Sequence, residues 1–412
     1  MGKKFVQYGA GNIGRGFIGQ LFSQSGYEVV FVDVVSDIVN KLNADRSYPI
    51  RIVSDEGAKE VIIENVRAVN GMDMEAVAQE IATADIMATS VGVNILPRIV
   101  KPILAGIRRR WEIGNEAPLN IIICENLIDA NKYLEELFKK EMSPAECARF
   151  DKSVGLVEAS IGRMVPVMTP EMQEGNILRV CVEEYSQLPV DKDAFKGEIP
   201  AVKDMLPFSP FEFFIRRKLF IHNMGHALTA YLGYLAGDKL ISDAIRNPYI
   251  RIIVQKAMTE SAVALAREFN MPVEEILLHV DDLIFRFGNR MLGDTVARVG
   301  RDTARKLAAN DRLVGAALLC ESLGLKNSAI CLGIAAGLLF APADDAASQK
   351  VQGILAEKGL DETLRQVCGL SPDSDIAVKV RTYYTLLKEQ RGDIPAVLAA
   401  LERIEDTERR RR

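Results

Sequence analysis

A lysine, an asparagine and a histidine occur close together in an otherwise apolar segment, at Lys218, Asn223 and His226. Their side chains are of types that transfer protons or donate hydrogen bonds. In an α-helix, with about 100° between successive residues, Asn223 and His226 lie roughly 60° apart and Lys218 lies roughly 80° from His226. Unpaired polar groups are costly to bury, so their convergence on an apolar helix calls for an explanation. From these residues alone two interpretations stay open: a shared chemical site, or a surface lysine beside a core histidine with satisfied hydrogen bonds.

A second segment suited to chemistry is the glycine-rich run Gly9-Ala10-Gly11-Asn12-Ile13-Gly14, which follows a predicted strand and opens a predicted helix. In that context the run predicts a dinucleotide-binding site. Gly9 permits a tight turn, Gly11 lets the backbone approach a pyrophosphate, and Gly14 permits close packing of helix on strand. The N-terminus of the helix then faces the phosphates.

The type of dinucleotide is indicated by Asp33, which ends the second predicted strand. A carboxylate there accepts hydrogen bonds from the adenosine ribose and repels the 2′-phosphate of NADP, so the sequence favours NAD. Thr89-Ser90-Val91-Gly92 ends a later strand, where small residues let the backbone pass near the cofactor. The simpler interpretation is a glycine-rich turn with an exposed aspartate, and an ordinary strand-to-loop turn.

The first half of the chain alternates strands and helices, which predicts βαβ units around a parallel sheet. Predicted strands are Lys4–Tyr8, Val29–Val34, Ile86–Val91 and Asn120–Cys124, with Leu178–Tyr185 as a further candidate for this sheet. Predicted helices are Phe17–Ser25, Val35–Ala44, Met74–Ala84 and Leu96–Glu112.

The second half changes character, because from Pro207 onward nearly every segment has helical periodicity. The predicted helices are Phe211–Ala236, Lys239–Arg246, Pro248–Phe269, Val273–Phe285, Ala329–Leu339, Ala346–Glu357 and Ile376–Glu389. A turn-rich cluster around 188–200 indicates a boundary. We therefore predict an α/β Rossmann-type dinucleotide-binding domain at residues 1–195 and an all-α substrate and catalytic domain at residues 196–412.

The composition is that of an ordinary globular protein, with 26% charged and 48% hydrophobic residues and a net charge of −5. This charge gives no electrostatic reason to bind nucleic acid or a membrane, and no apolar stretch reaches the roughly 18 residues of a spanning helix.

Six scattered cysteines and three histidines show no metal-ligand spacing, so we expect no metal. Without a signal peptide, we expect a cytoplasmic protein with a small-molecule partner, either a monomer or a small homo-oligomer.

Taken together, these segments resemble the polyol-specific long-chain dehydrogenase family, also called the mannitol dehydrogenase family, over nearly the whole chain. The motifs that carry the resemblance are Gly9–Gly19, Pro118–Ile122 with Cys124-Glu125-Asn126, Phe195–Gly197, Arg217–Phe220, Gly225–Ala227 with Thr229–Tyr231, Arg298–Arg301, Arg305–Leu307 and Asp311–Leu313. The resemblance implies a Rossmann domain joined to a helical substrate domain, a cleft between them as the active site, and no need for a metal.

The resemblance also implies the catalytic residues. The family signature is a lysine, an asparagine five residues on and a histidine three further, which Lys218, Asn223 and His226 match; a second asparagine matches Asn126. The implied reaction is NAD-dependent interconversion of mannitol 1-phosphate and fructose 6-phosphate. The lysine is the general base, as a lysine can be when burial or a nearby cation lowers its pKa from about 10.4. The two amides donate hydrogen bonds to the developing alkoxide. The histidine holds a substrate hydroxyl or positions the lysine.

A sugar phosphate needs a cationic clamp. Arg301, Arg305 and Lys306 form the densest basic cluster of the helical half, although a solvated helix face paired with Asp302 and Asp311 explains them equally well.

Relatives carry an aspartate where this chain has Gly162. This departure leaves room for another substrate, such as a different polyol, a polyol phosphate or an aldonate–uronate pair. A catalytically silent NAD-binding protein is the remaining alternative, and the intact set of polar residues speaks against it.

Overall fold

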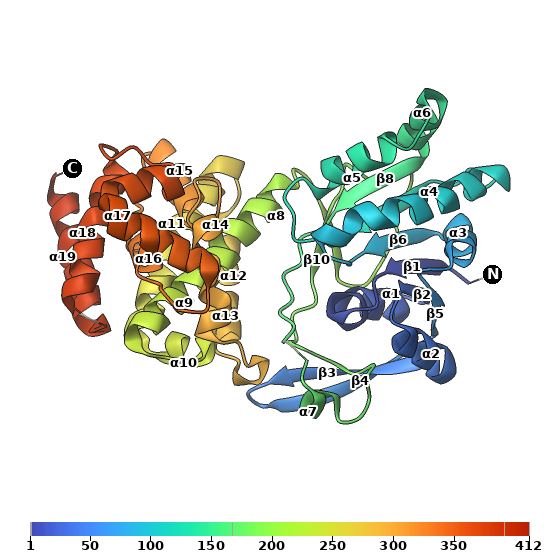
Figure 1. Ribbon diagram of the computed structural model, residues 1–412, viewed down its shortest axis with the longest axis horizontal. Helices are drawn as coiled ribbons and strands as arrows, with labels where there is room; N and C mark the ends of the chain where they lie inside the picture. Colours follow the sequence, from blue (N-terminus) through green and yellow to red (C-terminus); the bar gives the residue numbers. More distant parts are fainter. Residues whose placement is uncertain (1, 167, 391, 412) are drawn as a thin grey trace. The chain divides into compact units, whose positions relative to one another are not determined.

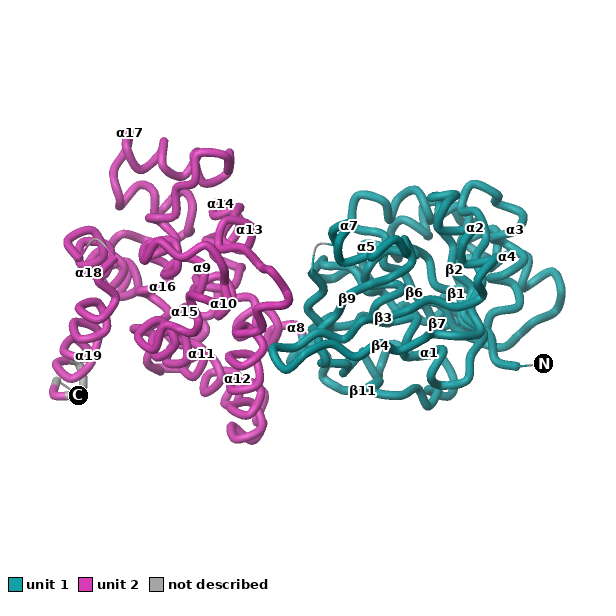
Figure 2. Tube along the Cα trace, turned by 90° about the horizontal axis from the view of Figure 1, so that it is seen from below, with its two compact units in different colours: residues 1–214 teal, residues 215–412 magenta. Residues whose placement is uncertain are grey.

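The computed structural model describes residues 2–166, 168–390 and 392–411, and the chain divides into two compact units, Met1–Phe214 and Ile215–Arg412 (Figure 2). The division lies later in the chain than the boundary predicted after Phe195. Residues 196–214 belong with the first unit because strand β11 (Met205–Phe208) pairs with β10 (Leu188–Asp191).

Unit 1 is built on a six-stranded, fully parallel sheet with the order β5-β2-β1-β6-β7-β8 (Figure 1). This is the order of a doubly wound dinucleotide-binding sheet, in which the chain runs outward in both directions from its centre. The predicted Rossmann-type domain is confirmed. The strands are β1 (Lys4–Tyr8), β2 (Glu28–Asp33), β5 (Val66–Asn70), β6 (Ile86–Thr89), β7 (Leu119–Ile123) and β8 (Val154–Glu158).

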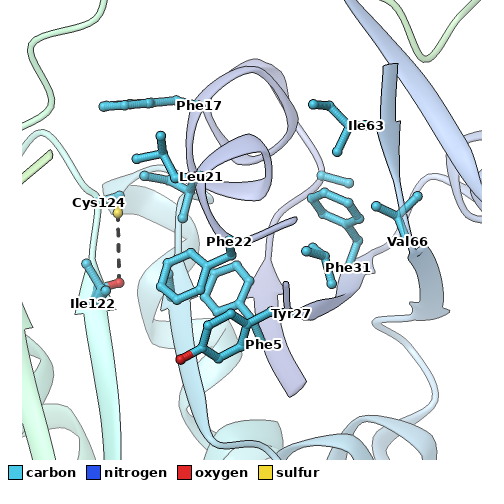
Figure 3. Packing of buried hydrophobic residues seen from close by; sticks show 14 of the residues in the cluster. Phe5, Phe17, Leu21, Phe22, Tyr27, Phe31, Ile63, Val66, Ile122 and Cys124 are labelled. Carbon is cyan, nitrogen blue, oxygen red and sulfur yellow. Dashed lines mark hydrogen bonds between the residues drawn. The ribbon is translucent and has the colours of Figure 1, made fainter. Parts of the chain in front are cut away.

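The strands are mostly apolar on both faces because helices cover both faces of the sheet. Successive side chains alternate between two hydrophobic clusters: Phe5 packs into one and Val6 into the other. In the cluster drawn in Figure 3, the rings of Phe5 and Phe22 stack with centroids 3.7 Å apart. The helices of unit 1 are η1 (Gly14–Gly19), α1 (Gln20–Gln24), α2 (Ser36–Asp45), α3 (Met74–Ala82), the 3₁₀ turn η2 (Val93–Ile95), α4 (Leu96–Glu112), α5 (Ala130–Lys139), α6 (Pro144–Ser153) and α7 (Pro170–Gln173).

One predicted strand does not belong to the main sheet. Within Leu178–Tyr185 the structure has β9 (Val180–Val182), which pairs with β3 (Ser47–Ser54). Together with β4 (Gly57–Glu64) they form a separate three-stranded sheet. The expectation that this segment extends the parallel sheet was therefore wrong, and the reason is that its valines pack on the first helix of the unit.

Unit 2 is helical, as predicted, and its most buried element is α16 (Ser328–Leu338). Every residue of α16 is buried, and the helix packs against α9, α11, α15, α18 and α19. A helix that is apolar all round needs such a central position. The other helices of this half are α8 (Glu212–Arg217), η3 (Lys218–Asn223), α9 (Met224–Ala236), α10 (Ile241–Arg246), α11 (Pro248–Phe269), α12 (Val273–Phe287), the 3₁₀ turn η4 (Arg290–Leu292), α13 (Val296–Gly300), α14 (Thr303–Lys306), α15 (Val314–Ser322), α17 (Ala346–Cys368), α18 (Asp375–Gln390) and α19 (Ile394–Arg411).

No helix among these described residues is both long enough and apolar enough to cross a membrane.

Candidate active site

The glycine-rich run lies at the carboxyl end of β1, and two of its glycines are required by close backbone contacts. Gly9 has a φ of +95°, and a Cβ added to it would fall 2.6 Å from the carbonyl oxygen of Ser90. A Cβ on Gly14 would fall 2.0 Å from the carbonyl oxygen of Gly9. By contrast, a Cβ on Gly11 would meet nothing within 4 Å. The turn is therefore tightly packed at Gly9 and Gly14, and it is open at Gly11, where a pyrophosphate needs to approach the backbone.

The helix that follows begins with a π-helical turn, η1. Gly19 is the last residue of this turn, and a Cβ added there would fall 2.8 Å from the carbonyl oxygen of Gly14. Arg163 is buried beside this turn and donates hydrogen bonds to the carbonyl oxygen of Gly16 at 3.0 Å and to Oε1 of Gln20 at 2.7 Å. A π turn disturbs the regular hydrogen-bond pattern of a helix, so that backbone carbonyl oxygens there are open to other donors. Because Arg163 donates to one of these carbonyl oxygens, it joins the segment after β8 to the helix of the predicted cofactor site.

Asp33 ends β2 as predicted, and its carboxylate is part of the glycine loop. Its Oδ2 accepts a hydrogen bond from the backbone N–H of Ala10 at 2.7 Å, and its Oδ1 accepts one from that of Val35 at 2.9 Å. Each carboxylate oxygen has two acceptor positions, so one position on each oxygen remains for a ribose hydroxyl. These residues fit an adenosine ribose.

The predicted loop Thr89-Ser90-Val91-Gly92 follows β6, next to β1 in the sheet. Thr89 is fully buried, whereas Val91 is partly exposed and Gly92 is exposed. Glu125 accepts hydrogen bonds from the backbone N–H groups of Val91 at 2.9 Å and Gly92 at 2.8 Å. Sequence reasoning missed Glu125; the available signal was a carboxylate directly after the buried strand β7, next to Asn126.

Asn126 is exposed and follows β7, so unit 1 brings it to the same sheet edge as the other predicted residues. The strands β2, β1, β6 and β7 are neighbours and parallel, and their carboxyl ends therefore meet at one edge. Ligands of open α/β sheets bind at this edge, near the point where the strand order reverses. Gly9–Gly14, Asp33, Thr89–Gly92 and Asn126 all lie there.

Lys218, Asn223 and His226 lie in unit 2, and all three are partly exposed. The predicted single helix Phe211–Ala236 is helical from Glu212 onward, but Lys218 to Asn223 form a π turn between α8 and α9. The angles calculated for an α-helix therefore do not apply to Lys218. Residues five apart, rather than four, come together in a π turn.

His226 lies at the start of α9, and its ring stacks on Phe287 with centroids 4.8 Å apart. The pKa of His226 is lowered to about 4, mainly by burial; Asp294 opposes this shift, and the nearby cations Arg298, Lys306 and Arg312 contribute to it. Its Nε2 lies 3.5 Å from Oδ2 of Asp294 and makes no hydrogen bond. The imidazole is therefore neutral at neutral pH.

His222, one turn before His226, is 7% exposed, and its ring centroid lies 5.7 Å from that of Phe287. Burial, with smaller effects from nearby cations, places the pKa of His222 well below its ordinary value. The rings of His222, His226 and Phe287 thus lie against one another, on residues next to Asn223 in the chain and on α12.

The three predicted phosphate ligands have different surroundings. Arg301 is exposed and lies 3.4 Å from Asp344, and Arg305 pairs with Asp302 at 2.6 Å and Asp311 at 3.3 Å. Lys306 is buried and donates a hydrogen bond to the carbonyl oxygen of Val299 at 2.5 Å. Burial, with repulsion from Arg312 and Arg305, lowers the pKa of Lys306 to about 7.

Gly162 follows β8 at the carboxyl edge of the unit 1 sheet. A Cβ at this position would lie 3.1 Å from Cε1 of Tyr185 and 3.5 Å from its hydroxyl oxygen. The space in front of Gly162 is therefore partly filled by the Tyr185 ring, and an aspartate here needs that ring to move.

In the part of the chain that the structure describes, no three His, Cys, Asp or Glu side chains are grouped so as to hold a metal ion.

Comparison with curated proteins gives relatives that extend over nearly the whole chain. A mannitol-1-phosphate 5-dehydrogenase of Brevibacillus brevis is 38% identical over 387 residues, which are 94% of this chain and 99% of that protein. The mannitol-1-phosphate 5-dehydrogenase of Bacillus licheniformis is 39% identical over 372 residues, which are 90% of this chain and 97% of that protein.

Two solved structures share the fold. D-Sorbitol dehydrogenase in substrate-free form matches with a TM-score of 0.81 at 16% identity, over 96% of this chain and 94% of that one. Mannitol 2-dehydrogenase of Pseudomonas fluorescens, in a ternary complex with NAD and D-mannitol, matches with a TM-score of 0.73 at 15% identity, over 97% and 94% of the two chains.

Family models cover both halves of the chain. The mannitol dehydrogenase Rossmann domain matches residues 3–204, and the mannitol dehydrogenase C-terminal domain matches residues 211–404. The chain therefore belongs to the mannitol dehydrogenase family of oxidoreductases.

Proposed function

We propose that this protein interconverts D-mannitol 1-phosphate and D-fructose 6-phosphate with NAD as cofactor. The observation that carries the proposal is the π turn with Lys218 at its start and Asn223 at its end, followed by the neutral imidazole of His226. The names of the two relatives at 38% and 39% identity support the choice of substrate.

The proposed roles follow from what alcohol oxidation needs. The nicotinamide ring, when bound, supplies the acceptor for the hydride that leaves the carbinol carbon. Lys218 in its amine form takes the hydroxyl proton, and in the reverse direction its ammonium form protonates the ketose oxygen. The amides of Asn223 and Asn126 donate hydrogen bonds to the oxygen as it gains negative charge. His226, uncharged at neutral pH, binds a substrate hydroxyl by a hydrogen bond and leaves the charge of the site unchanged.

NAD is preferred over NADP in this proposal because of Asp33. The free acceptor positions of its carboxylate suit two ribose hydroxyls, and its negative charge opposes a 2′-phosphate. Gly11 leaves the backbone of the loop open to the pyrophosphate.

An anionic substrate is supported by the cations around His226. Arg298, Lys306 and Arg312 all lie close enough to lower its pKa. Of the three phosphate ligands that the sequence suggests, Lys306 is the one among these cations. We propose Lys306 as the principal phosphate ligand, with Arg301 and Arg305 as weaker candidates, since both already pair with aspartates.

One observation favours a second substrate. The side chain at position 162 is absent and Tyr185 partly fills the space in front of it. The same chemistry on another polyol, polyol phosphate or aldonate–uronate pair is therefore the alternative.

The test is NADH oxidation with fructose 6-phosphate, fructose, fructuronate and tagaturonate as four separate substrates. We expect fructose 6-phosphate to have the highest kcat/KM and fructose to be poor, because fructose lacks the phosphate. A preference for fructuronate or tagaturonate would establish the alternative. No turnover with any of the four, by a protein that binds NADH, would instead support a catalytically silent binding protein.

A further inference from the structure

The loops after β6 and β7 are joined by a carboxylate. Glu125 is 7% exposed, and each of its oxygens accepts one backbone hydrogen bond: Oε1 from Val91 at 2.9 Å and Oε2 from Gly92 at 2.8 Å. The backbone N–H of Cys124 also donates to the carbonyl oxygen of Thr89 at 2.9 Å. The two loops are thus held together by three hydrogen bonds at the sheet edge where the cofactor is proposed to bind.

The geometry of the second loop explains why a carboxylate fits there. Gly92 has a φ of +90°, a conformation that side chains rarely adopt. Successive N–H groups at such a turn point to one side and form a small anion-binding concavity. In many nucleotide proteins a phosphate occupies such a concavity. Here the chain fills it with its own carboxylate, so the N–H groups of Val91 and Gly92 are not donors to the cofactor.

The residue after Glu125 is Asn126, the proposed hydrogen-bond donor in unit 1. With both carboxylate oxygens bound, the backbone at Glu125 is fixed relative to the loop after β6, and the peptide that leads into Asn126 is fixed with it. A misplacement of about 1 Å in a reacting geometry is sufficient to lower a rate roughly 100-fold. The position of the Asn126 amide therefore depends on a side chain that does not itself contact substrate.

We propose that Glu125 is a positioning residue for hydride transfer: by clamping Val91 and Gly92 it sets where the Asn126 amide meets the substrate oxygen. This inference rests on the proposed function, because it needs Asn126 as the donor.

The experiment compares kcat for Glu125→Gln, Asn126→Ala and the double variant with fructose 6-phosphate and NADH. Glutamine keeps the size of glutamate, but its NH₂ group faces one of the two N–H donors, so the clamp opens. We expect Glu125→Gln to lower kcat about 100-fold. The double variant is expected to be no slower than Asn126→Ala alone, because a residue that acts through another gives a non-additive pair. Glu125→Asp, which keeps the carboxylate, is expected to recover part of the loss.

A matched control is Glu158→Gln. Glu158 ends β8 and its Oε1 accepts the backbone N–H of Ala130 at 3.0 Å, so it too is a strand-end carboxylate that holds a loop. Glu158 holds the start of α5 instead of the loop after β6. We therefore expect the kcat of Glu158→Gln to stay within a few-fold of that of the parent enzyme. Thermal unfolding and NADH titration of each variant separate a loss of positioning from a loss of folding or cofactor binding.

Two results overturn the inference in distinguishable ways. If Glu125→Gln and Asn126→Ala each lower kcat and their effects multiply in the double variant, Glu125 acts independently of Asn126, and the proposed function stands without the inference. If Asn126→Ala leaves kcat unchanged, the proposed role of Asn126 fails and the inference fails with it. The inference is supported if Glu125→Gln has an unchanged melting temperature and its effect on kcat is not additive with that of Asn126→Ala.

Discussion

Lys218 and Asn223 are the first and last residues of one π-helical turn. In an α-helix, residues five apart lie about 140° from each other, on different faces. A π turn, with hydrogen bonds between residues i and i+5, brings the same pair onto one side. His226 follows three residues later in regular α-helix, about 60° from Asn223. The spacing of the three polar residues is thus matched to this irregular turn and not to a straight helix.

The first prediction concerns the proton acceptor. Lys218→Ala is expected to lower kcat by roughly 100- to 10,000-fold, the usual contribution of general acid–base catalysis, with little change in NADH affinity. Steady-state kinetics with fructose 6-phosphate and a fluorescence titration with NADH measure the two quantities. Arg216→Ala is the matched control: Arg216 is a cation on the preceding helix, 3.5 Å from Glu268, and its loss is expected to leave kcat within a few-fold. Retained turnover in Lys218→Ala would remove the lysine as the base.

Much of unit 1 could be predicted because its signals are local. The apolar strands, Gly9 to Gly14, and Asp33 at the end of the next strand each follow from backbone requirements that act within a few residues. The helix Leu96–Glu112 lies where its periodicity places it. The pairing of β9 with β3 depends on contacts between segments about 130 residues apart, which periodicity does not reveal.

The details of the site were harder to predict for the same reason. A π turn has the same apolar residues as the α-helix around it, so the pattern around Lys218 and Asn223 predicts helix and no more. The role of Glu125 depends on a loop that precedes it by more than thirty residues. The pairing of Arg305 with two aspartates was weighed from the sequence, but the burial of Lys306 among the same residues was not foreseen.

The second prediction concerns the choice of cofactor. Asp33→Asn is expected to raise the ratio of kcat/KM with NADPH to that with NADH roughly 10-fold, because a repulsion of about 1 to 2 kcal/mol with the 2′-phosphate is removed. NADH affinity is expected to fall as well, since Asp33 also accepts the N–H groups of Ala10 and Val35. Kinetics with both cofactors give the ratio. Asp85→Asn is a suitable control, because Asp85 accepts the N–H of Lys4 at the opposite edge of the sheet. A ratio that does not move in Asp33→Asn would contradict the assigned role of this carboxylate.

The third prediction concerns the stability of unit 2 between pH 7 and pH 10. The pKa of Lys306 is lowered to about 7 in the folded protein from its ordinary value of 10.5, mainly by burial. Between these values the unfolded chain holds a proton that the folded chain has released, so the free energy of unfolding rises with pH by up to about 1.4 kcal/mol per pH unit. Below pH 7 both states are protonated and this dependence ends. Lys306→Met is expected to remove this part of the slope, whereas Lys239→Met, at an exposed position of the same unit, retains it. Denaturant unfolding at successive pH values measures the slopes, and equal slopes for the parent and Lys306→Met would mean that Lys306 stays charged in the folded protein. In that case it remains a permanent cation beside His226, and phosphate binding does not weaken as the pH rises above 7.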